Sequence, residues 1–456
     1  MNTFAHIVLI AFAPLAGCLF RVLSLQWALA VTVVGGHLYL PVLKIPLTGL
    51  PDYTKSMAIS AALLLGLLIR AESLPRQQPL RWWDALFLTW ILSLPISYLA
   101  NGYPAYNAFS ALFDRMMIWG APYWIGRAAF PSTASIGILL RCLVLGSLTY
   151  IPLALWEIRM SPQLHTQIYG AFQHTFLQTI RWGGFRPIVF MAHPLHLALW
   201  FAITLLAAIR LKKHLSGVPA WYKRAWWLAP GFALMLLLCK SLGPLALGLT
   251  AAASLSIRSC RSLLALAIIA GATYLLGRIF FDEAVYQWVL PWLDYLPADR
   301  AQSIQFRMDN ERLLLARAWE QPFFGFVKEG FRTITVDGEV QNRVVADSLW
   351  IVAFGTTGLL GLISLYGTML TAAVRGHFHK DRYARDEIQI LSTIVAVLAL
   401  DTIANGQPSP FAIVCMGAVL GHSTKPSPNP LACGPATKAS RASNRLRPRH
   451  RPATSS

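Results

Sequence analysis

The amino-acid sequence predicts an all-α membrane protein, a helical bundle of about 12 to 13 spans with one large extracytoplasmic loop. Hydrophobic residues make up 55% of the chain and charged residues only 13%, whereas a soluble protein carries about 25% charged residues. Apolar runs of about 20 residues recur along the whole length, and a run of that length crosses a bilayer as a helix. The short loops between these runs are rich in Lys and Arg, which is typical of the cytoplasmic loops of a multi-pass protein.

Thirteen apolar segments account for the predicted spans. No Lys or Arg precedes the first segment and Arg21 follows it, which is the reverse of the order in a cleaved signal peptide. We therefore expect a retained span with its N-terminus outside, and the count falls to 12 if this segment does not cross. The segments lie at about residues 5–20, 27–43, 55–70, 84–100, 107–126, 134–156, 189–209, 226–240, 243–257, 262–281, 347–374, 388–405 and 408–422.

The net charge of +19 does not indicate nucleic acid as a partner. The cations lie in short loops between apolar runs and in the tail, where the positive-inside bias of membrane proteins places them. The six cysteines form no CxxC pair, so the sequence indicates neither a disulfide framework nor a zinc site. Asp309, Asn310 and Glu311 provide three oxygen ligands on one predicted helix, but this pattern is too unspecific to predict a metal.

Four regions follow from this pattern. Residues 1–281 carry the N-terminal spans, 282–346 form the large loop, and 347–422 carry the C-terminal spans. Residues 423–456 are rich in Pro, Ser and Ala and carry cations without any acid. This segment lacks the apolar content to fold, so we expect a disordered basic tail that contacts anionic lipid on the cytoplasmic side.

The large loop differs in composition from the cationic loops. It holds ten of the 20 acidic residues together with seven cations, which favours the extracytoplasmic face. Aromatic residues scattered through it argue against disorder. Apolar residues at helical spacing from 304 to 320 predict an amphipathic helix at the membrane surface. Pro322 and Gly325 predict that this helix ends in a turn.

Two motifs lie at this loop and at the helix that follows it. Arg307 is followed by fourteen residues and then Pro322-Phe-Phe-Gly325. Further on, Asp347-Ser348 is followed by nine residues and then Gly358-Leu-Leu-Gly361. These motifs, with the Arg186-Pro187 and His193-Pro194 segments, resemble the O-antigen ligase and polysaccharide polymerase superfamily. About twelve spans with one large loop before the last few is also the layout of that superfamily.

The resemblance implies a metal-independent glycosyltransferase of the bacterial inner membrane, with a periplasmic loop and a cytoplasmic tail. Its donor would be a glycan on undecaprenyl diphosphate, its acceptor another glycan or lipid, and no cofactor would be needed. The chain departs from the family at one position. Where family ligases carry a His that serves as catalytic base, this chain carries Asp347, so that role does not transfer directly.

Transfer from a polyprenyl diphosphate needs a cation for the leaving group and a base for the acceptor hydroxyl. An arginine fork suits the first task because it binds phosphate oxygens and stays charged. Arg307 and Arg186 are therefore the candidate cations, and Asp347 is the candidate base, with His193 and Glu311 as other possible bases. The substrate-binding candidates are Arg312, His193 and Ser348.

Each of these residues also has a structural interpretation. Asp-Ser at a helix start is a good N-cap, so Asp347 and Ser348 alone predict a cap. Glycines spaced as Gly358 and Gly361 favour close packing of spans. Arginines at a membrane interface commonly extend to lipid headgroups, and a His before a helix can be an ordinary polar residue. The Asp114-Arg115 pair inside a predicted span is either functional or a neutralising pair.

Two other classes of function stay open at this stage. A secondary transporter would show matched halves and broken helices near the membrane midplane, and no matched halves are evident in the sequence. A non-catalytic family member that assembles envelope polysaccharide is the second, because Asp347 replaces the family's His. A scaffold would tolerate Asp347→Ala, whereas a transferase would not.

Overall fold

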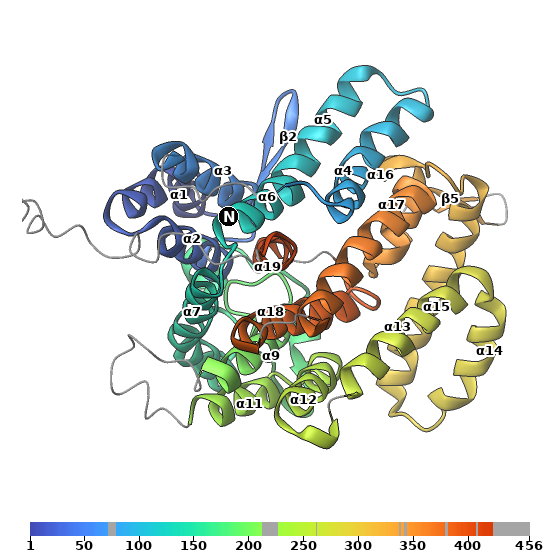
Figure 1. The fold of residues 1–456 in the computed structure, drawn as a ribbon. Coiled ribbons are helices and arrows are strands. Elements are labelled where there is room, and N and C mark those ends of the chain that lie inside the picture. The colour runs from blue at the N-terminus through green and yellow to red at the C-terminus, as the bar shows by residue number, and fades with distance from the viewer. Residues whose placement is uncertain are drawn as a thin grey trace, which may run out of the picture. The chain divides into compact units, whose positions relative to one another are not determined.

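A computed structural model describes residues 1–71, 79–211, 227–260, 262–336, 339–341, 344–378, 382–406 and 409–422 of the chain. Helices form almost all of its regular structure (Figure 1), so the predicted all-α class is confirmed within this part of the chain. The predicted tail at 423–456 lies outside the described residues.

Each predicted apolar segment coincides with a helix or with helices in direct succession. The segment predicted at 107–126 is the most divided, because a π-helical turn separates α5 from α6. The helices before the large loop are α1 (Thr3–Val22), α2 (Leu25–Tyr39), α3 (Lys55–Ile69), α4 (Trp82–Ala100), α5 (Ala105–Arg115), η2 (Met116–Gly120), α6 (Ala121–Ala129), α7 (Thr133–Met160), α8 (Leu164–Tyr169), η3 (Phe176–Thr179), α9 (Pro194–Leu211), α11 (Leu228–Leu238), α12 (Leu242–Ser256), η4 (Arg258–Cys260) and α13 (Leu263–Phe280).

The remaining helices begin at the large loop, and three small hairpins complete the described structure. The later helices are α14 (Asp282–Leu293), α15 (Ala298–Glu320), α16 (Val327–Phe331), α17 (Leu349–Arg375), η5 (Gly376–Phe378), α18 (Arg382–Asp401) and α19 (Pro410–Gly421). The antiparallel hairpins are β1 (Lys44–Leu47) with β2 (Leu50–Thr54), β3 (Ile180–Arg181) with β4 (Gly184–Phe185), and β5 (Ile334–Val336) with β6 (Glu339–Gln341).

Five helices in the described part of the chain are long and apolar enough to cross a membrane, and five shorter apolar helices accompany them. The chain therefore has the character of a membrane protein, as predicted. The count of 12 to 13 spans and the side on which each loop lies remain predictions. One boundary differs clearly, because the segment predicted at 189–209 becomes helical only at Pro194. The five long helices are Thr3–Val22, Trp82–Ala100, Thr133–Met160, Arg258–Phe280 and Leu349–Arg375.

The large loop is mostly helical, and its predicted helix at 304–320 is confirmed as part of α15. Met308, Leu314 and Ala318 are buried on one side of α15, while Phe306 on another side is 55% exposed. In Figure 1, α13, α14, α15 and α17 follow one another as neighbours, and the contacts between these helices agree. The location of α15 at a membrane surface stays a prediction.

The outer face of α14 carries a stripe of exposed aromatic side chains. Trp288 and Trp292 on α14, and Tyr295 just after its end, lie at i, i+4 and i+7 spacing, with exposed fractions of 67%, 59% and 83%. Tyr286 and Leu293 on the same helix are buried. The large apolar surface of this helix therefore faces outward, whereas several apolar side chains of α15 face inward.

Helix α17 is broken in the middle by the turn that precedes α16. Gly358 has φ 66° and ψ −168°, so the ladder of i→i−4 hydrogen bonds is interrupted there. The Leu359 N–H donates instead to the Pro322 carbonyl at 2.7 Å, and the Gly355 carbonyl accepts from the Phe326 N–H at 2.8 Å. The turn thus supplies both partners that the break would otherwise leave unpaired.

Two glycines permit this close approach. A Cβ on Gly358 would lie 2.2 Å from the Phe323 carbonyl carbon, and one on Gly325 would lie 2.6 Å from the Thr356 carbonyl carbon. Both glycines also have positive φ, which other residues rarely adopt. Gly358 therefore serves backbone packing, which was one of the two interpretations of its motif.

The charged residues Asp114 and Arg115 in α5 have different partners. Asp114 pairs with Lys328 of α16 at 2.7 Å. The Arg115 guanidinium lies 3.5 Å from the centre of the Trp90 ring, and its Nη1 donates to the Trp90 carbonyl at 2.7 Å. Asp114 thus ties α5 to the large loop, and Arg115 ties α5 to α4.

Candidate functional site

The two motif segments meet at an ion pair between Arg307 and Asp347. Arg307 lies on α15, and Asp347 lies two residues before α17 begins. The Arg307 Nε is 3.4 Å from the Asp347 Oδ2, and the two side chains are 34% and 38% exposed. The structure therefore brings the predicted cation and the predicted base together at a place that solvent reaches.

The end of α18 forms another side of this site. The Arg307 Nη1 donates to the Ala404 carbonyl at 2.9 Å and to Asn405 Oδ1 at 3.4 Å. The Asn405 Nδ2 in turn donates to Asp401 Oδ1 at 2.8 Å. The residues after α18 thus bind the guanidinium through Nη1, and the Asp347 carboxylate, just before α17, pairs with its Nε.

Ser348 occupies the N-cap position of α17, but its hydroxyl does not cap the helix. The Ser348 Oγ donates to the Glu311 carboxylate instead, and the Leu349 N–H bonds to the carbonyls of Thr402 and Asn405. Together with the Asp347–Arg307 pair, these contacts replace the capping pattern that an Asp-Ser pair predicts. The two side chains are used to join α17 to α15.

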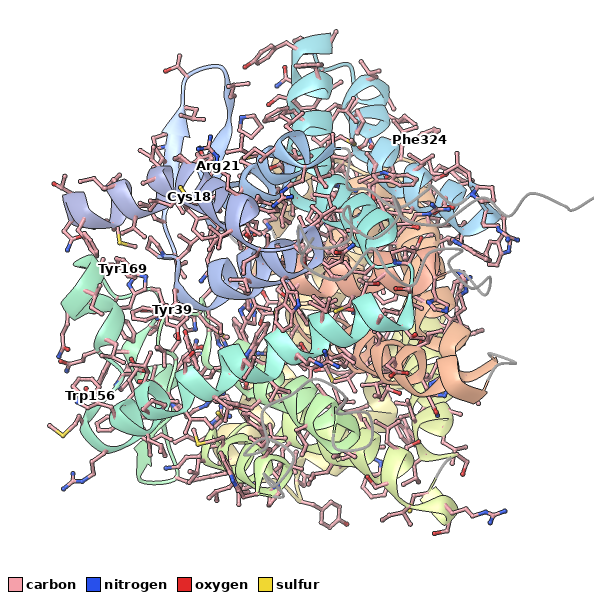
Figure 2. The ribbon with its side chains drawn as sticks, turned by 60° about the vertical axis from the view of Figure 1, so that its left-hand side comes forward. Cys18, Arg21, Tyr39, Trp156, Tyr169 and Phe324 are labelled. Atoms are coloured by element: carbon pink, nitrogen blue, oxygen red, sulfur yellow. The ribbon has the colours of Figure 1, made fainter. Side chains whose placement is uncertain are left out.

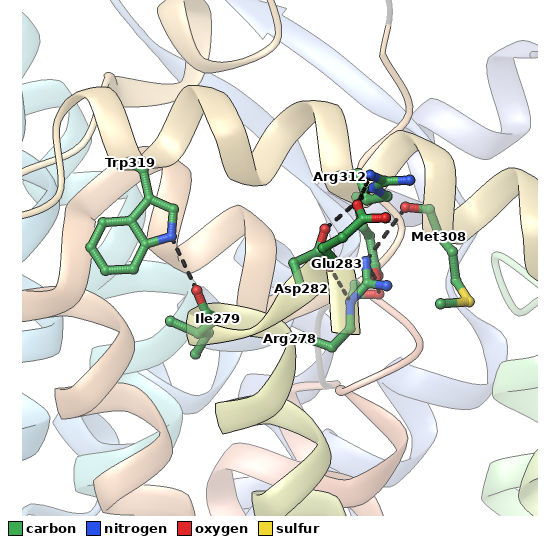
Figure 3. A network of polar contacts seen from close by, with 9 residues as sticks. Arg278, Ile279, Asp282, Glu283, Met308, Arg312 and Trp319 are labelled. Atoms are coloured by element: carbon green, nitrogen blue, oxygen red, sulfur yellow. Dashed lines mark hydrogen bonds and ion pairs between the residues drawn. The ribbon is translucent and has the colours of Figure 1, made fainter. Parts of the chain in front are cut away.

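Glu311 connects this site to a buried ionic network, part of which Figure 3 shows. Its Oε2 lies 3.3 Å from Nη2 of the fully buried Arg278, and the Arg278 Nε lies 3.1 Å from Asp282 Oδ1. Burial raises the pKa of Glu311, while the Ser348 hydrogen bond and the charges of Arg278 and Arg307 act in the opposite direction. A carboxyl group with a raised pKa accepts a proton more readily than an ordinary one.

Arg312, a predicted substrate-binding residue, faces α14 rather than Arg307. Its guanidinium pairs with Glu283, lies 3.5 Å from Asp282 Oδ2 and stacks 4.2 Å from the centre of the Tyr286 ring. Figure 3 shows Arg312 beside Asp282 and Glu283. Its role as a substrate ligand stays a prediction, and its present contacts fix α14 against α15.

Arg186, the second predicted cation, is buried with an exposed fraction of 1%. Its Nη2 donates to Ser241 Oγ at 2.6 Å, and its Nε and Nη1 reach the carbonyls of Cys239 and Gln178. These contacts attach the segment after the β3–β4 hairpin to the turn between α11 and α12. In this arrangement Arg186 acts on the surrounding fold, and direct contact with a phosphate stays a prediction.

His193 lies in the loop just before α9, near both predicted arginines. Burial lowers the pKa of His193 to about 2, with further contributions from His174, His196, Arg186 and Arg307. Its ring packs 4.5 Å from that of His174, centre to centre. The imidazole is therefore neutral and a weak base, which favours substrate hydrogen bonding over proton abstraction for this residue.

The sequence interpretation missed three residues that complete the site, namely Asn405, Asp401 and Arg278. Asp401 and Asn405 are polar residues spaced i, i+4 at the end of an apolar segment, a signal that predicts a shared face. Arg278 is a charge near the end of an apolar run, the same kind of signal as Asp114. Within the described residues, no group of three His, Cys, Asp or Glu side chains is arranged to hold a metal ion.

No protein-family model matches this chain, and no curated protein matches it either.

Proposed function

We propose that this protein is a membrane glycan transferase that moves or polymerises glycan from a polyprenyl-diphosphate donor. The Arg307–Asp347 pair carries the proposal, since it joins the two motifs on which the resemblance depends. The glycan donor and a glycan or lipid acceptor are the proposed partners. The proposed location is a bacterial inner membrane, with residues 282–346 in the periplasm.

The proposed reaction needs one group that stabilises the leaving diphosphate of the donor and one that takes the proton of the acceptor hydroxyl. The acceptor oxygen attacks the anomeric carbon, the bond from that carbon to the diphosphate oxygen breaks, and the diphosphate leaves with the electron pair. Arg307 would stabilise the charge that develops on the leaving group. Asp347 would take the proton of the acceptor hydroxyl.

The resting ion pair suggests how both groups become available together. A diphosphate carries more negative charge than one carboxylate, so it competes with Asp347 for Arg307. Once released from Arg307, the Asp347 carboxylate is free to take the proton of the acceptor hydroxyl. Donor binding would therefore free the base. Glu311 is the second candidate base, since it lies next to Ser348 and its pKa is raised.

A non-catalytic role in envelope-polysaccharide assembly is the first alternative. In that case the ion pair would only connect α15 to the start of α17. A secondary transporter is the second alternative, and the break of α17 at Gly358 is a feature that transporters use to bind substrates. Here the backbone groups at Leu359 and Gly355 already bond to Pro322 and Phe326, which favours the transferase proposal over a transporter.

Deletion and complementation in the native host would test the proposal. The gene is restored as wild type, Arg307→Ala, Asp347→Ala or Asp347→Asn, and envelope polysaccharide is run on a gel beside a blot for the protein. Arg159→Ala is the control, since Arg159 is an exposed arginine at the end of α7.

A glycan band that is lost on deletion and stays missing with normally expressed site variants would support a transferase. Loss of long chains alone would indicate a polymerase, and accumulation of free lipid-linked chains would indicate a ligase. Restoration of the wild-type pattern by every site variant would reject the catalytic assignment.

A further inference from the structure

A cavity of about 750 Å³ lies beside the candidate site. On one side it is bounded by the last turn of α2, the first turns of α3, the β1–β2 hairpin and α5. On the other side it is bounded by the start of α9 and the junction of α18 and α19. Asp401, which accepts a hydrogen bond from the Arg307 partner Asn405, belongs to its wall. We call it the Lys55 cavity. Its polar lining includes His37, Lys55, Asn107, Ser110, His196 and Asp401.

The lining changes from polar to apolar along the helices. On α3 the wall passes from Lys55 to Ile59, and on α9 it passes from His196 to Ile203. Leu398 on α18 belongs to the apolar part. A cavity of several hundred cubic ångströms with an apolar wall and a few polar groups is the usual form of a ligand site. Its ligand is therefore expected to have a charged or polar end and an apolar part.

Lys55 provides an amine whose charged form a bound anion would favour. Its Nζ donates to the carbonyls of Leu40 and Phe190 at 2.8 and 2.9 Å. No carboxylate among the described residues lies within ion-pair distance of this ammonium group. An ammonium group has three N–H donors, so one donor is left after the two carbonyls are bonded. Asp114 in the same wall is already paired with Lys328.

Two imidazoles stand near Lys55 with their own polar atoms unused. His37 and His196 line the cavity and are only partly buried. The structure gives their ring nitrogens no hydrogen-bond partner within the described residues. The His37 ring packs on Trp200, 4.8 Å from centre to centre, which fixes its position. One free ammonium donor and two free imidazoles form a set of groups that suits an oxyanion.

The neighbouring carbonyls at the end of α2 do not depend on Lys55 alone. The hydroxyl of Tyr150 bonds the Leu38 carbonyl at 2.9 Å, and that of Tyr169 bonds the Tyr39 carbonyl at 2.7 Å. Figure 2 shows Tyr39 and Tyr169 as neighbours. The local fold thus has other anchors, and a charged side chain is not required at this position to hold α2.

We propose that the Lys55 cavity binds an anionic amphiphile, whose phosphate or carboxylate group contacts Lys55, His37 and His196 while its apolar part lies against Ile59, Leu199 and Ile203. Lys55 makes no described contact with Arg307, so binding at Lys55 can be measured separately from transfer, although Asp401 belongs both to the cavity wall and to the candidate site. The proposal adds an anion site of its own and makes a phosphate-bearing or carboxylate-bearing lipid the class of ligand.

Native mass spectrometry of the purified full-length protein would test this binding. The probes are dioleoyl phosphatidic acid, with dioleoyl phosphatidylcholine as the zwitterionic comparison. We expect the wild type to retain phosphatidic acid preferentially and Lys55→Gln to lose about tenfold in affinity, as for one charged hydrogen bond. Lys55→Arg should restore binding because it keeps the charge.

The Asp114→Asn, Lys328→Gln double variant is the matched control, since it removes a lysine of the same wall together with the carboxylate that neutralises it. His196→Leu provides a second test that leaves the Lys55 contacts to Leu40 and Phe190 in place. Equal affinities of the wild type, Lys55→Gln and His196→Leu would overturn the proposal. If Lys55→Gln does not fold, His196→Leu decides.

Inorganic phosphate and glucuronate, tested by thermal shift, separate the possible sources of the anion. If either free anion stabilises the protein but phosphatidic acid binds no better than phosphatidylcholine, the proposal of an amphiphilic ligand is wrong. Binding of phosphatidic acid that depends on Lys55 supports the proposal whether or not the Arg307 variants retain transfer activity.

Discussion

Arg307 and Asp347 face each other between α15 and the start of α17, with Nε and Oδ2 3.4 Å apart. Both side chains are about one-third exposed, and exposed ion pairs contribute only about 0–1 kcal/mol to stability. The pair is therefore well suited to mutation, because its removal separates an effect on chemistry from an effect on folding.

Arg307→Ala and Asp347→Ala should each leave the unfolding temperature nearly unchanged while the glycan product falls by about 100-fold or more, as for the loss of a stabilising donor or a general base. Product is measured by gel densitometry in the complemented deletion strain, and stability by differential scanning fluorimetry. If the ion pair only connects α15 to the start of α17, the opposite is expected, namely intact product and a lower unfolding temperature.

Asp347→His places the residue of family ligases at this position. An imidazole has an ordinary pKa near neutrality and is a better base than a carboxylate at that pH. We expect Asp347→His to retain more product than Asp347→Asn, which keeps the shape of the side chain but cannot accept the proton. Equal loss in both variants would argue that the carboxylate acts through its pairing with Arg307 and not as a base.

Glu311→Gln should change how stability depends on pH. Burial raises the pKa of Glu311, so the folded state favours its protonated form. This stabilisation is complete below the ordinary pKa of about 4.5 and is lost as the pH rises through the raised pKa. We therefore expect the wild type to lose stability relative to Glu311→Gln as the pH rises above about 4.5. Unfolding temperatures between about pH 4 and pH 8 measure this, and a constant difference would contradict it.

Gly358→Ala and Gly325→Ala should each destabilise the protein by about 2–4 kcal/mol, because a Cβ would overlap backbone atoms and both residues have positive φ. Gly243→Ala in α12 is the control, since a Cβ there meets nothing within 4 Å. Chemical denaturation of each variant, solubilised in a mild detergent, measures its free energy of unfolding. Similar stabilities for all three variants would show that the turn does not dock in the break of α17.

The aromatic stripe of α14 should lie in lipid. We expect an environment-sensitive fluorophore at Trp292→Cys to report an apolar surrounding in nanodiscs, and the same label at Gln302→Cys on α15 to report water. Both positions are tested in a background in which Cys18, Cys260 and Cys433 are replaced, so that the introduced cysteine takes the label. An aqueous signal at position 292 would leave the stripe without a membrane role.

The sequence predicted the helices well because apolar runs, charged loops and the turn at Pro322-Gly325 are local signals. It also placed Arg307 and Asp347 in one site, because motif spacing reflects how segments meet. It did not predict the partners of these residues. Asn405 reaches Arg307 from the end of α18, and Glu311 takes the hydroxyl of Ser348 from its helix cap. Such contacts depend on how distant helices pack, and no local pattern specifies them.

The same limit applies to Arg186 and Arg312. Both residues were interpreted from their charge and from the expected side of the membrane. These two properties predict on which side a guanidinium lies, but they do not predict which residues it contacts. The structure shows Arg186 on the α11–α12 turn and Arg312 on α14. Burial of one and pairing of the other arise from tertiary packing, which competes with the simple expectation of a free cation.

The break in α17 at Gly358 has a consequence for how the protein is inserted during synthesis. Two of its backbone groups, the Leu359 N–H and the Gly355 carbonyl, find their partners in Pro322 and Phe326, which are synthesised earlier. In a bilayer-spanning α17, which its length and composition allow, an unpaired backbone group would be unfavourable by several kcal/mol, so such a helix would be poorly suited to integrate alone. Because residues 322–326 precede it, the complementary segment has already left the ribosome when α17 emerges. A chain that starts after Phe326 would have to insert this helix with its break unfilled.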